Sequence, residues 1–334
     1  MAKTKRVLSG MRPTGAAHLG HLFGAFANWV AMQEELDTFY CIVDWHALTT
    51  DYADTSELKA NTRELALDFL AAGLDPDKST LFVQSHVPEH AELHLLLSMV
   101  VPLPWLERVP TYKEQMTQLE GKDLTTYGFL GYPLLQAADI LIYRADYVPV
   151  GVDQQPHVEL TREIARRFNN FYGAVVPEPE VKLTPTPKLP GTDGRKMSKS
   201  YGNTIGLAED EVSIRKKLKT MVTDPARKLR TDPGDPAICP VFDLHRVFST
   251  EPTQAWAAEG CRTAGIGCIE CKSALADNVV AELEPIRRRR REFERRPDDV
   301  RDIYQKGAAR ARDVASATMV DVRNAMQLLA EDEL

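Results

Sequence analysis

The chain has 334 residues, of which 43% are hydrophobic and 27% are charged, so it can bury a sizeable core and is not a disordered polyelectrolyte. It carries 41 Lys and Arg against 48 Asp and Glu, a net charge of −7. This charge excludes a protein that binds DNA of any sequence through an overall positive electrostatic field. No apolar run reaches the roughly eighteen residues that span a membrane, and no signal-peptide core follows the basic N-terminus, so we expect a cytoplasmic protein without a membrane partner.

Segments typical of strands and helices alternate through about the first 190 residues. In chain order we predict a strand at 6–11, a helix at 18–36, a strand at 39–48, a helix from Thr55 or Ser56 to Gly73, a strand at 80–85 and a helix at 89–101. This alternation predicts an α/β fold with a doubly wound parallel sheet.

The pattern changes after a stretch rich in Pro and Gly at 182–194, which we expect to be a loop or hinge. Beyond it, residues 209–222, 273–296 and 308–329 have the composition and spacing of helices, and no strong strand follows. We therefore predict a first domain at 1–195 and an α-helical second domain at 196–334.

Residues 13–21, which we call the glycine turn, read Pro-Thr-Gly-Ala-Ala-His-Leu-Gly-His between the first predicted strand and helix. In a doubly wound sheet this turn meets the phosphates of a ligand, and glycine lets the backbone approach them closely. His18 and His21 are three residues apart, so they share one face of the helix, and their ring N–H groups could donate to phosphate oxygens. The alternative is a helix cap with two surface histidines.

Residues 194–200, which we call the lysine loop, read Gly-Arg-Lys-Met-Ser-Lys-Ser at the end of the Pro- and Gly-rich stretch. Two lysines and two hydroxyls on a loop suit a clamp on a triphosphate, although a solvated basic loop has the same composition. Neither segment matches a Walker-type loop or a dinucleotide fingerprint.

Together, His18-Leu19-Gly20-His21 and Lys196-Met197-Ser198-Lys199-Ser200 resemble the signature pair of class I aminoacyl-tRNA synthetases. Residues 41–49, 132–141 and 148–162 look like tryptophanyl-tRNA synthetases, and this resemblance covers essentially the whole chain. It implies a Rossmann-like catalytic domain at 1–195 that binds ATP and tryptophan, and a helical domain at 196–334 that binds the tRNA anticodon. The implied reaction activates L-tryptophan with ATP, releases pyrophosphate, and transfers tryptophan from the adenylate to tRNA(Trp).

The resemblance also implies site residues, with His18, His21, Lys196 and Lys199 as the catalytic set. The implied ATP-binding residues are Met11, Arg12, Pro13, Thr14, Gly20, His21, Gly151, Val152, Asp153, Lys196, Met197, Ser198, Lys199 and Ser200. Tryptophan would be bound by Asp139, Tyr132, Gln154, His46 and Val43. Mg²⁺ would accompany ATP, and a homodimer would form through residues 99–127.

Asp139 also has a physical argument. It lies in an apolar stretch, where an unpaired carboxylate is costly and therefore needs a donor. Indole offers one N–H and no acceptor, so a fixed carboxylate at the base of a pocket would select tryptophan over phenylalanine. The alternative is an acid in a helix interior, paired with Arg144 or a lysine.

Cys239, Cys261, Cys268 and Cys271 have the spacing C-x21-C-x6-C-x2-C. Four thiolates suit zinc or a [4Fe–4S] cluster, and empty or oxidised thiols remain a further alternative. A subgroup of tryptophanyl-tRNA synthetases resembles this pattern, with a first gap one residue longer and an iron–sulfur cluster beside the anticodon-binding region. Cys41 is expected in the core.

The densest basic run is at residues 287–291, followed by Arg295 and Arg296. It is typical of a solvated helix face paired with neighbouring glutamates, and the alternative is contact with tRNA phosphates. Two rival functions for the chain are a small-molecule adenylyltransferase and a non-catalytic synthetase paralogue.

Overall fold

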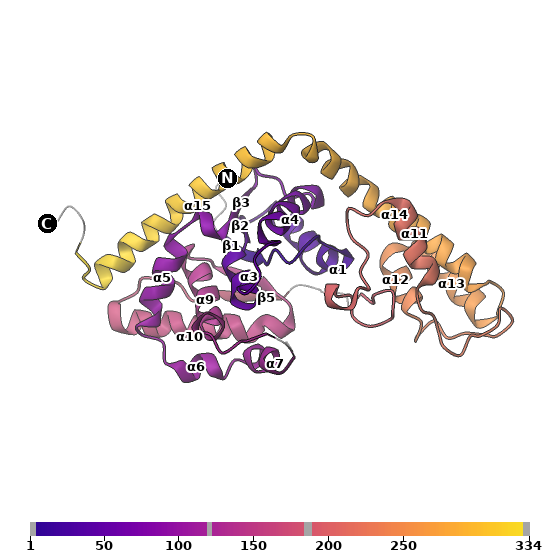
Figure 1. Ribbon diagram of the computed structural model, residues 1–334, viewed down its shortest axis with the longest axis horizontal. Coiled ribbons are helices and arrows are strands. Elements are labelled where there is room, and N and C mark those ends of the chain that lie inside the picture. The colour runs from indigo at the N-terminus through magenta and orange to yellow at the C-terminus, as the bar shows by residue number, and fades with distance from the viewer. Residues whose placement is uncertain (1–4, 119–121, 184–188, 330–334) are drawn as a thin grey trace.

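A five-stranded parallel sheet forms the centre of the first half of the protein. The computed structural model describes residues 5–118, 122–183 and 189–329. The strand order is β3-β2-β1-β4-β5 (Figure 1). The strands are β1 (Arg6–Met11), β2 (Asp37–Ile42), β3 (Ser79–Val83), β4 (Tyr147–Val150) and β5 (Glu180–Leu183). The direction of winding reverses between β1 and β4, which confirms the doubly wound sheet and places its switch point there.

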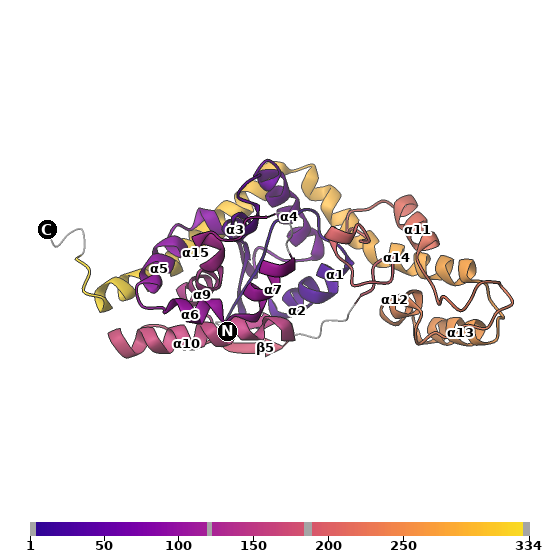
Figure 2. The same cartoon turned by 60° about the horizontal axis from the view of Figure 1, so that its bottom comes forward.

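Alternate side chains of each strand point to opposite faces, so the sheet separates two apolar layers. Val7 and Tyr40 belong to one layer, and Leu8 and Phe39 to the other. The first layer is covered by α1 (Leu19–His21), a π-helical turn (Leu22–Phe26), α2 (Ala27–Met32) and α4 (Leu58–Ala72). The second is covered by α5 (Glu89–Ser98), α9 (Tyr132–Ile142) and α10 (Gln155–Tyr172), which lie together in Figure 2.

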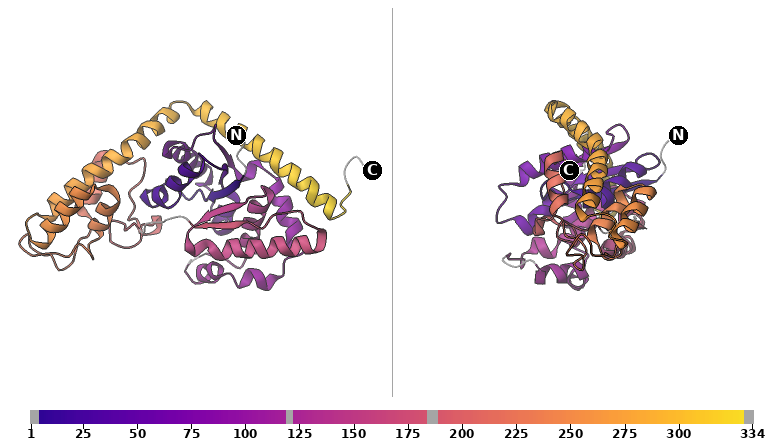
Figure 3. Two further views of the ribbon diagram at one scale, coloured as in Figure 1. Left: turned by 180° about the vertical axis from the view of Figure 1, so that it is seen from behind. Right: turned by 90° about the vertical axis from the view of Figure 1, so that its right-hand side faces the viewer.

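The later part of the chain is helical. Its elements are α11 (Glu211–Thr220), α12 (Pro240–Phe248), α13 (Glu251–Arg262), α14 (Cys268–Glu294) and α15 (Pro297–Ala325). α11 to α13 lie at one end of the molecule, away from the sheet, and α14 runs from them back to α4 (Figure 3). Leu275, Val279 and Leu283 of α14 share one continuous core with the first layer of the sheet.

The last helix returns to the sheet. α15 packs against β3 and α5, and Ala308, Ala311 and Ala315 belong to the second apolar layer. Tyr304 belongs to the first layer and donates to the carbonyl of Ala66 at 3.2 Å. α15 therefore crosses from one apolar layer to the other at the β3 edge of the sheet. This helix belongs to the segment that was predicted as the second domain. The division at residue 195 stays a prediction.

The remaining short elements connect the strands and helices. They are α3 (Asp44–Asp51), a 3₁₀ turn (Gln84–His86), α6 (Leu103–Glu107), α7 (Pro110–Gln118), α8 (Tyr127–Leu130), and 3₁₀ turns at Val152–Gln154 and Lys199–Tyr201. Within the described parts of the chain, no helix has the length and apolar character needed to cross a membrane.

Most predicted elements are present, with different limits. The strand predicted to run to Leu48 ends at Ile42, because Asp44 opens α3 and its carboxylate accepts the N–H of Ser85 at 3.0 Å. The helix predicted at 18–36 contains the π-helical turn, and α4 ends at Gly73, whose φ of 110° is left-handed. Part of the loop predicted at 182–194 lies outside the described residues.

Gly307 permits the close approach of α15 to β3. A Cβ at this position would overlap the carbonyl oxygen of Leu81, which is backbone and cannot move aside. We predict that Gly307→Ala lowers the free energy of unfolding by about 2 kcal/mol, despite the better helix propensity of alanine, because of this overlap. Denaturant unfolding measures the effect. Gly128→Ala is the matched control, since a Cβ there meets nothing within 4 Å, and equal stability of the two variants would contradict the prediction.

Candidate active site

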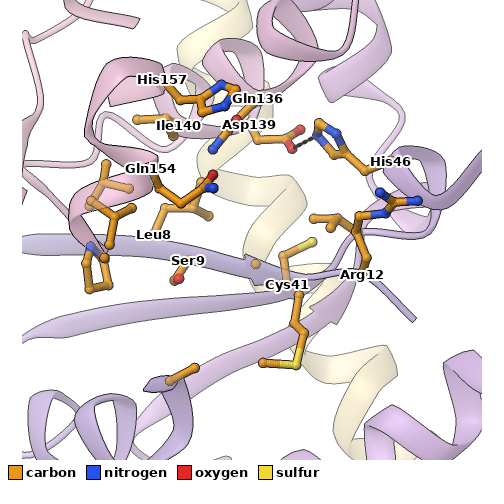
Figure 4. A pocket seen from close by; sticks show the side chains of 18 of the residues that line it. Leu8, Ser9, Arg12, Cys41, His46, Gln136, Asp139, Ile140, Gln154 and His157 are labelled. Atoms are coloured by element: carbon orange, nitrogen blue, oxygen red, sulfur yellow. Dashed lines mark hydrogen bonds and ion pairs between the residues drawn. The ribbon is translucent and has the colours of Figure 1, made fainter. Parts of the chain in front are cut away.

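A pocket of about 420 Å³ opens at the carboxyl ends of β1 and β4, the switch point of the sheet (Figure 4). Its lining includes every residue predicted to bind tryptophan, namely Asp139, Tyr132, Gln154, His46 and Val43. Of the predicted ATP-binding residues it includes Met11, Arg12 and Gly151. Val152 lies outside this lining with 72% of its surface exposed.

Asp139 lies on α9 at the buried end of this pocket and is 5% exposed. Its Oδ2 accepts from His46 Nε2 at 2.9 Å, its Oδ1 accepts from His90 Nδ1 at 2.6 Å, and Gln84 Nε2 donates to both oxygens at 2.8 and 2.9 Å. Arg144, the partner considered from the sequence, instead pairs with Asp321. The carboxylate thus has three polar partners and capacity for a further donor from the pocket.

These contacts determine the charge of Asp139. Burial alone would raise the pKa of Asp139, but the neighbouring His90 and His46 lower it below its usual range. His90 Nε2 lies 2.7 Å from the hydroxyl of Tyr143, so the ring bridges Tyr143 and Asp139 and is fixed from both sides. The carboxylate is therefore ionised and held in one orientation at the end of an apolar pocket. Gln84 and His90, which follow β3, carry no local sequence pattern that marks them as site residues.

Tyr132 faces the same pocket from the start of α9. Its hydroxyl lies 2.8 Å from Thr111 Oγ1, which lies 2.6 Å from His157 Nε2. Burial lowers the pKa of His157 to about 4, so its ring is neutral at physiological pH and Nε2 can accept. If His157 accepts from Thr111, then Thr111 accepts from Tyr132. The lone pairs of the tyrosine oxygen are then available to accept from a ligand that donates, such as an ammonium group.

In the glycine turn, His18 is the N-cap of α1 and its Nδ1 accepts the N–H of Gly20 at 3.1 Å. His21 Nδ1 accepts the N–H of His18 at 3.1 Å, and the two ring centroids are 3.8 Å apart. Because both Nδ1 atoms accept, each neutral ring must carry its proton on Nε2. The turn thus presents two ring donors.

Burial is the main cause of a lowered pKa for both histidines, about 4 for His18 and about 3 for His21, with Lys199 adding to the effect. His18 also lowers the pKa of His21. The helix-cap part of the alternative is confirmed, because His18 caps α1. The surface-histidine part is wrong for His18, which is 7% exposed, and His21 is partly buried. Both rings are neutral donors at physiological pH.

The lysine loop lies against the glycine turn. Lys199 Nζ donates to the carbonyl of Gly15 at 2.7 Å, and burial lowers the pKa of Lys199. The segment after the loop pairs with the turn through the backbone, with Leu19 N–H donating to Ile205 and Leu207 N–H to Ala17, both at 3.0 Å. The two signature elements thus form one surface although they are far apart in sequence.

Within the lysine loop, Met197 is buried and Lys196 is exposed. Asn203 Oδ1 accepts the N–H of Ser198 at 2.8 Å, and its amide donates to Asp193 at 2.7 Å. Asn203 is 2% exposed, so it holds the loop in shape. The sequence pattern did not single it out.

The four cysteines Cys239, Cys261, Cys268 and Cys271 gather where α12, α13 and α14 meet. Burial is the main cause of the raised pKa of Cys271, which is about 12, and electrostatic interaction with the three other thiols adds to it. Among the described residues, no group of three or more His, Cys, Asp or Glu is arranged so that it could hold a metal ion.

Two buried cations, Arg227 and Lys272, face these thiols. The Nε of Arg227 is buried without a hydrogen-bond partner among the described residues. Four thiolates around a [4Fe–4S]²⁺ core or around Zn²⁺ carry a net charge of −2, which two nearby cations offset. The residue types and the charge of their surroundings therefore suit a dianionic group bound by four thiolates.

Comparison with known proteins agrees with this geometry. A family profile described as tRNA synthetases class I (W and Y) matches residues 2–284. Tryptophan–tRNA ligase from Thermotoga maritima is 56% identical, covering 97% of this chain and 99% of that protein, and the one from Ralstonia nicotianae is 48% identical, covering 97% and 98%. A solved structure of tryptophanyl-tRNA synthetase from Campylobacter jejuni, complexed with ADP and tryptophan, superposes with a TM-score of 0.88 at 35% identity and covers 97% of this chain and 100% of that chain. The chain therefore belongs to the class I tRNA synthetases, and among them to the tryptophanyl-tRNA synthetases.

Proposed function

We propose that the protein is a tryptophan–tRNA ligase that forms tryptophanyl-adenylate at the switch-point pocket and then charges tRNA(Trp). The observation that carries this proposal is the contact between the glycine turn and the lysine loop beside a pocket that ends in the ionised Asp139. The membership of the chain in this family supports the same reaction.

In the first step, a carboxylate oxygen of tryptophan attacks the α-phosphorus of ATP. The bond from that phosphorus to the bridging oxygen breaks, and pyrophosphate leaves with the negative charge. In the second step, a hydroxyl of the terminal ribose of tRNA attacks the acyl carbon and AMP leaves. The substrates supply both nucleophiles, so the protein contributes position and charge stabilisation.

The charge that builds on pyrophosphate would be met from both signature elements. His18 and His21 donate from Nε2 without carrying charge, and Lys199 adds a cation from the lysine loop. Lys196 is exposed and can reach the phosphates when the loop closes. Mg²⁺ enters with ATP and is held mainly by phosphate oxygens.

Tryptophan would bind with its indole N–H on Asp139 and its ammonium group on Tyr132 and Gln154. His46 and Val43 complete the wall of the pocket. A ligand without the indole donor, such as phenylalanine, leaves a buried carboxylate short of a partner, and such a loss can cost about 10⁴-fold in selectivity. The three fixed donors on Asp139 sharpen this selection, because the carboxylate cannot turn away.

A second copy of the chain would cover the region 99–127. Met99, Leu103 and Tyr127 are 67%, 56% and 63% exposed, which supports an apolar interface. Leu106 in the same region is 3% exposed, so it packs inward and is not part of this apolar surface. We place tRNA contacts on the helical region that includes α11 to α14.

Cys239, Cys261, Cys268 and Cys271 would hold a [4Fe–4S] cluster. We favour this cluster over zinc because the cysteine spacing resembles that of the family subgroup with an iron–sulfur cluster, and the cations Arg227 and Lys272 would offset its charge. The cluster would supply a cross-link between the ends of α12, α13 and α14, and thereby order the helical region.

The first prediction is that ATP–pyrophosphate exchange requires tryptophan among the amino acids. Asp139→Asn should lower the catalytic efficiency with tryptophan by about 100-fold or more and reduce the preference over phenylalanine, since the amide group loses the charge and half of the acceptors. Asp321→Asn, which alters an exposed carboxylate on α15, is the control. Unchanged discrimination in the Asp139 variant would refute the assignment, and exchange with tyrosine instead would overturn the role of the pocket.

The second prediction concerns pH. The pKa values of about 4 for His18 and about 3 for His21 lie below 6.5, so the unfolded chain takes up protons first and the free energy of unfolding should fall as pH drops from 6.5 towards 4. Nitrogen NMR of labelled rings should show both histidines neutral, protonated at Nε2, at about pH 6. A ring that titrates near 6.5 in the folded protein would show that the burial argument is wrong.

The third prediction concerns the cysteines. Anaerobically purified protein should contain iron and inorganic sulfide, and Cys268→Ser should lose both and bind tRNA(Trp) more weakly. Cys41→Ala removes a cysteine from β2 and should keep the iron. Stoichiometric zinc in the unaltered protein, or full iron content in Cys268→Ser, would argue against the cluster.

A further inference from the structure

Asp68 on α4 is a buried acid that the reaction as described does not use. It is 1% exposed, and its Oδ2 accepts the backbone N–H of Ala17 at 2.7 Å. Ala17 immediately precedes His18, so this bond fixes the backbone from which both signature histidines project. Asp68 is absent from the lining of the pocket, and it acts on the glycine turn from behind.

The counter-ion of Asp68 comes from the far end of the chain. Arg290 on α14 binds Asp68 Oδ1 through Nη1 and Glu64 through Nη2, and its Nε donates to Glu294 at 2.8 Å. The side chains of Arg290 and Asp68 are 7% and 1% exposed, so this ion pair is buried, while Glu64 and Glu294 contact the same guanidinium from the solvent side with 45% of their side chains exposed. This contact overturns the sequence-based view of Arg290 as part of a solvated helix face.

The same carboxylate also faces the lysine loop. Burial lowers the pKa of Lys199, and the negative charge of Asp68 opposes this by stabilising the charged ammonium. Lys199 donates to Gly15, two residues before Ala17. One buried anion therefore lies behind the glycine turn and close to the lysine that would meet the phosphates.

We propose that Asp68 and Arg290 are positioning residues for ATP, through which α14 holds the glycine turn and the lysine loop in the arrangement that binds the triphosphate. The proposal rests on the adenylation function given above. α14 begins at Cys268 and ends four residues beyond Arg290. The helix that carries two of the four cysteines thus also supplies the counter-ion beneath the ATP-binding turn.

Removing either partner has a defined physical consequence. Without Arg290, Asp68 is a buried carboxylate with only backbone support, and it takes up a proton or shifts toward water. Its bond to Ala17 then weakens from a charge-assisted to a neutral hydrogen bond, and Lys199 loses its anion. Asp68→Asn has the same consequence from the other side while it keeps the size of the side chain.

The test is tryptophan-dependent ATP–pyrophosphate exchange by Asp68→Asn, Arg290→Gln and the double variant. We expect the KM for ATP to rise about tenfold in each single variant, from the loss of one charge-assisted contact, while the KM for tryptophan changes less than about twofold. Because the two residues act as one unit, the KM for ATP of the double variant should be no higher than that of the more impaired single variant.

Arg291→Gln is the matched control, since it removes the next arginine of α14, which is half exposed and paired with Glu284 at 2.7 Å. It should leave both KM values unchanged. If Arg290→Gln is unfolded at the assay temperature, as judged by its melting curve, Asp68→Asn decides the question.

An unchanged KM for ATP in folded Asp68→Asn, equal rises of both KM values, or additive effects in the double variant would overturn the proposal. Absence of exchange in the unaltered protein would instead overturn the proposed function, so the two failures can be told apart.

Discussion

The backbone around Ala17–His18–Leu19 is the constraint on which the site depends. Its groups bond to two distant parts of the chain: Ala17 N–H to Asp68 on α4, and Ala17 C=O and Leu19 N–H to Leu207 and Ile205 after the lysine loop. None of these partners is close in sequence, so the turn has its shape only in the finished fold. Once that shape exists, the two histidine rings satisfy the remaining N–H groups with Nδ1 and present Nε2 outward. The same hydrogen bonds thus determine the backbone geometry of the glycine turn and the tautomer of both histidines.

A second network of hydrogen bonds between residues distant in sequence holds the pocket on the other face of the sheet. Asp139 comes from α9, His90 from α5, Gln84 from the turn after β3 and His46 from α3. Each would be a costly buried polar group alone, and together they satisfy one another. Selectivity for an indole donor therefore follows from a core that cannot rearrange without losing several hydrogen bonds.

Features that a local sequence pattern determines could be predicted from the sequence. Strand β1, helix α4 with its terminal Gly73, and the order of strands and helices follow from periodicity and turn residues, and the two nucleotide-binding signals stood out by composition. The end of β2 was placed wrongly because Asp44 begins α3 through a contact with Ser85. Gln84, His90 and Arg290 were missed for a related reason: their partners lie 49 to 222 residues away, and no local pattern marks a residue as the counterpart of a distant carboxylate.

The position of α15 has a consequence for the order in which the protein is made. β3 is an edge strand of the sheet, and the helix that packs against it begins only at Pro297. During synthesis, β1 to β5 and the pocket emerge from the ribosome long before this helix does. The nascent sheet must therefore spend much of translation with an unprotected edge, which is the feature that favours pairing with a second chain. Only after α15 has been made can it pack against β3 and shield the sheet at this edge.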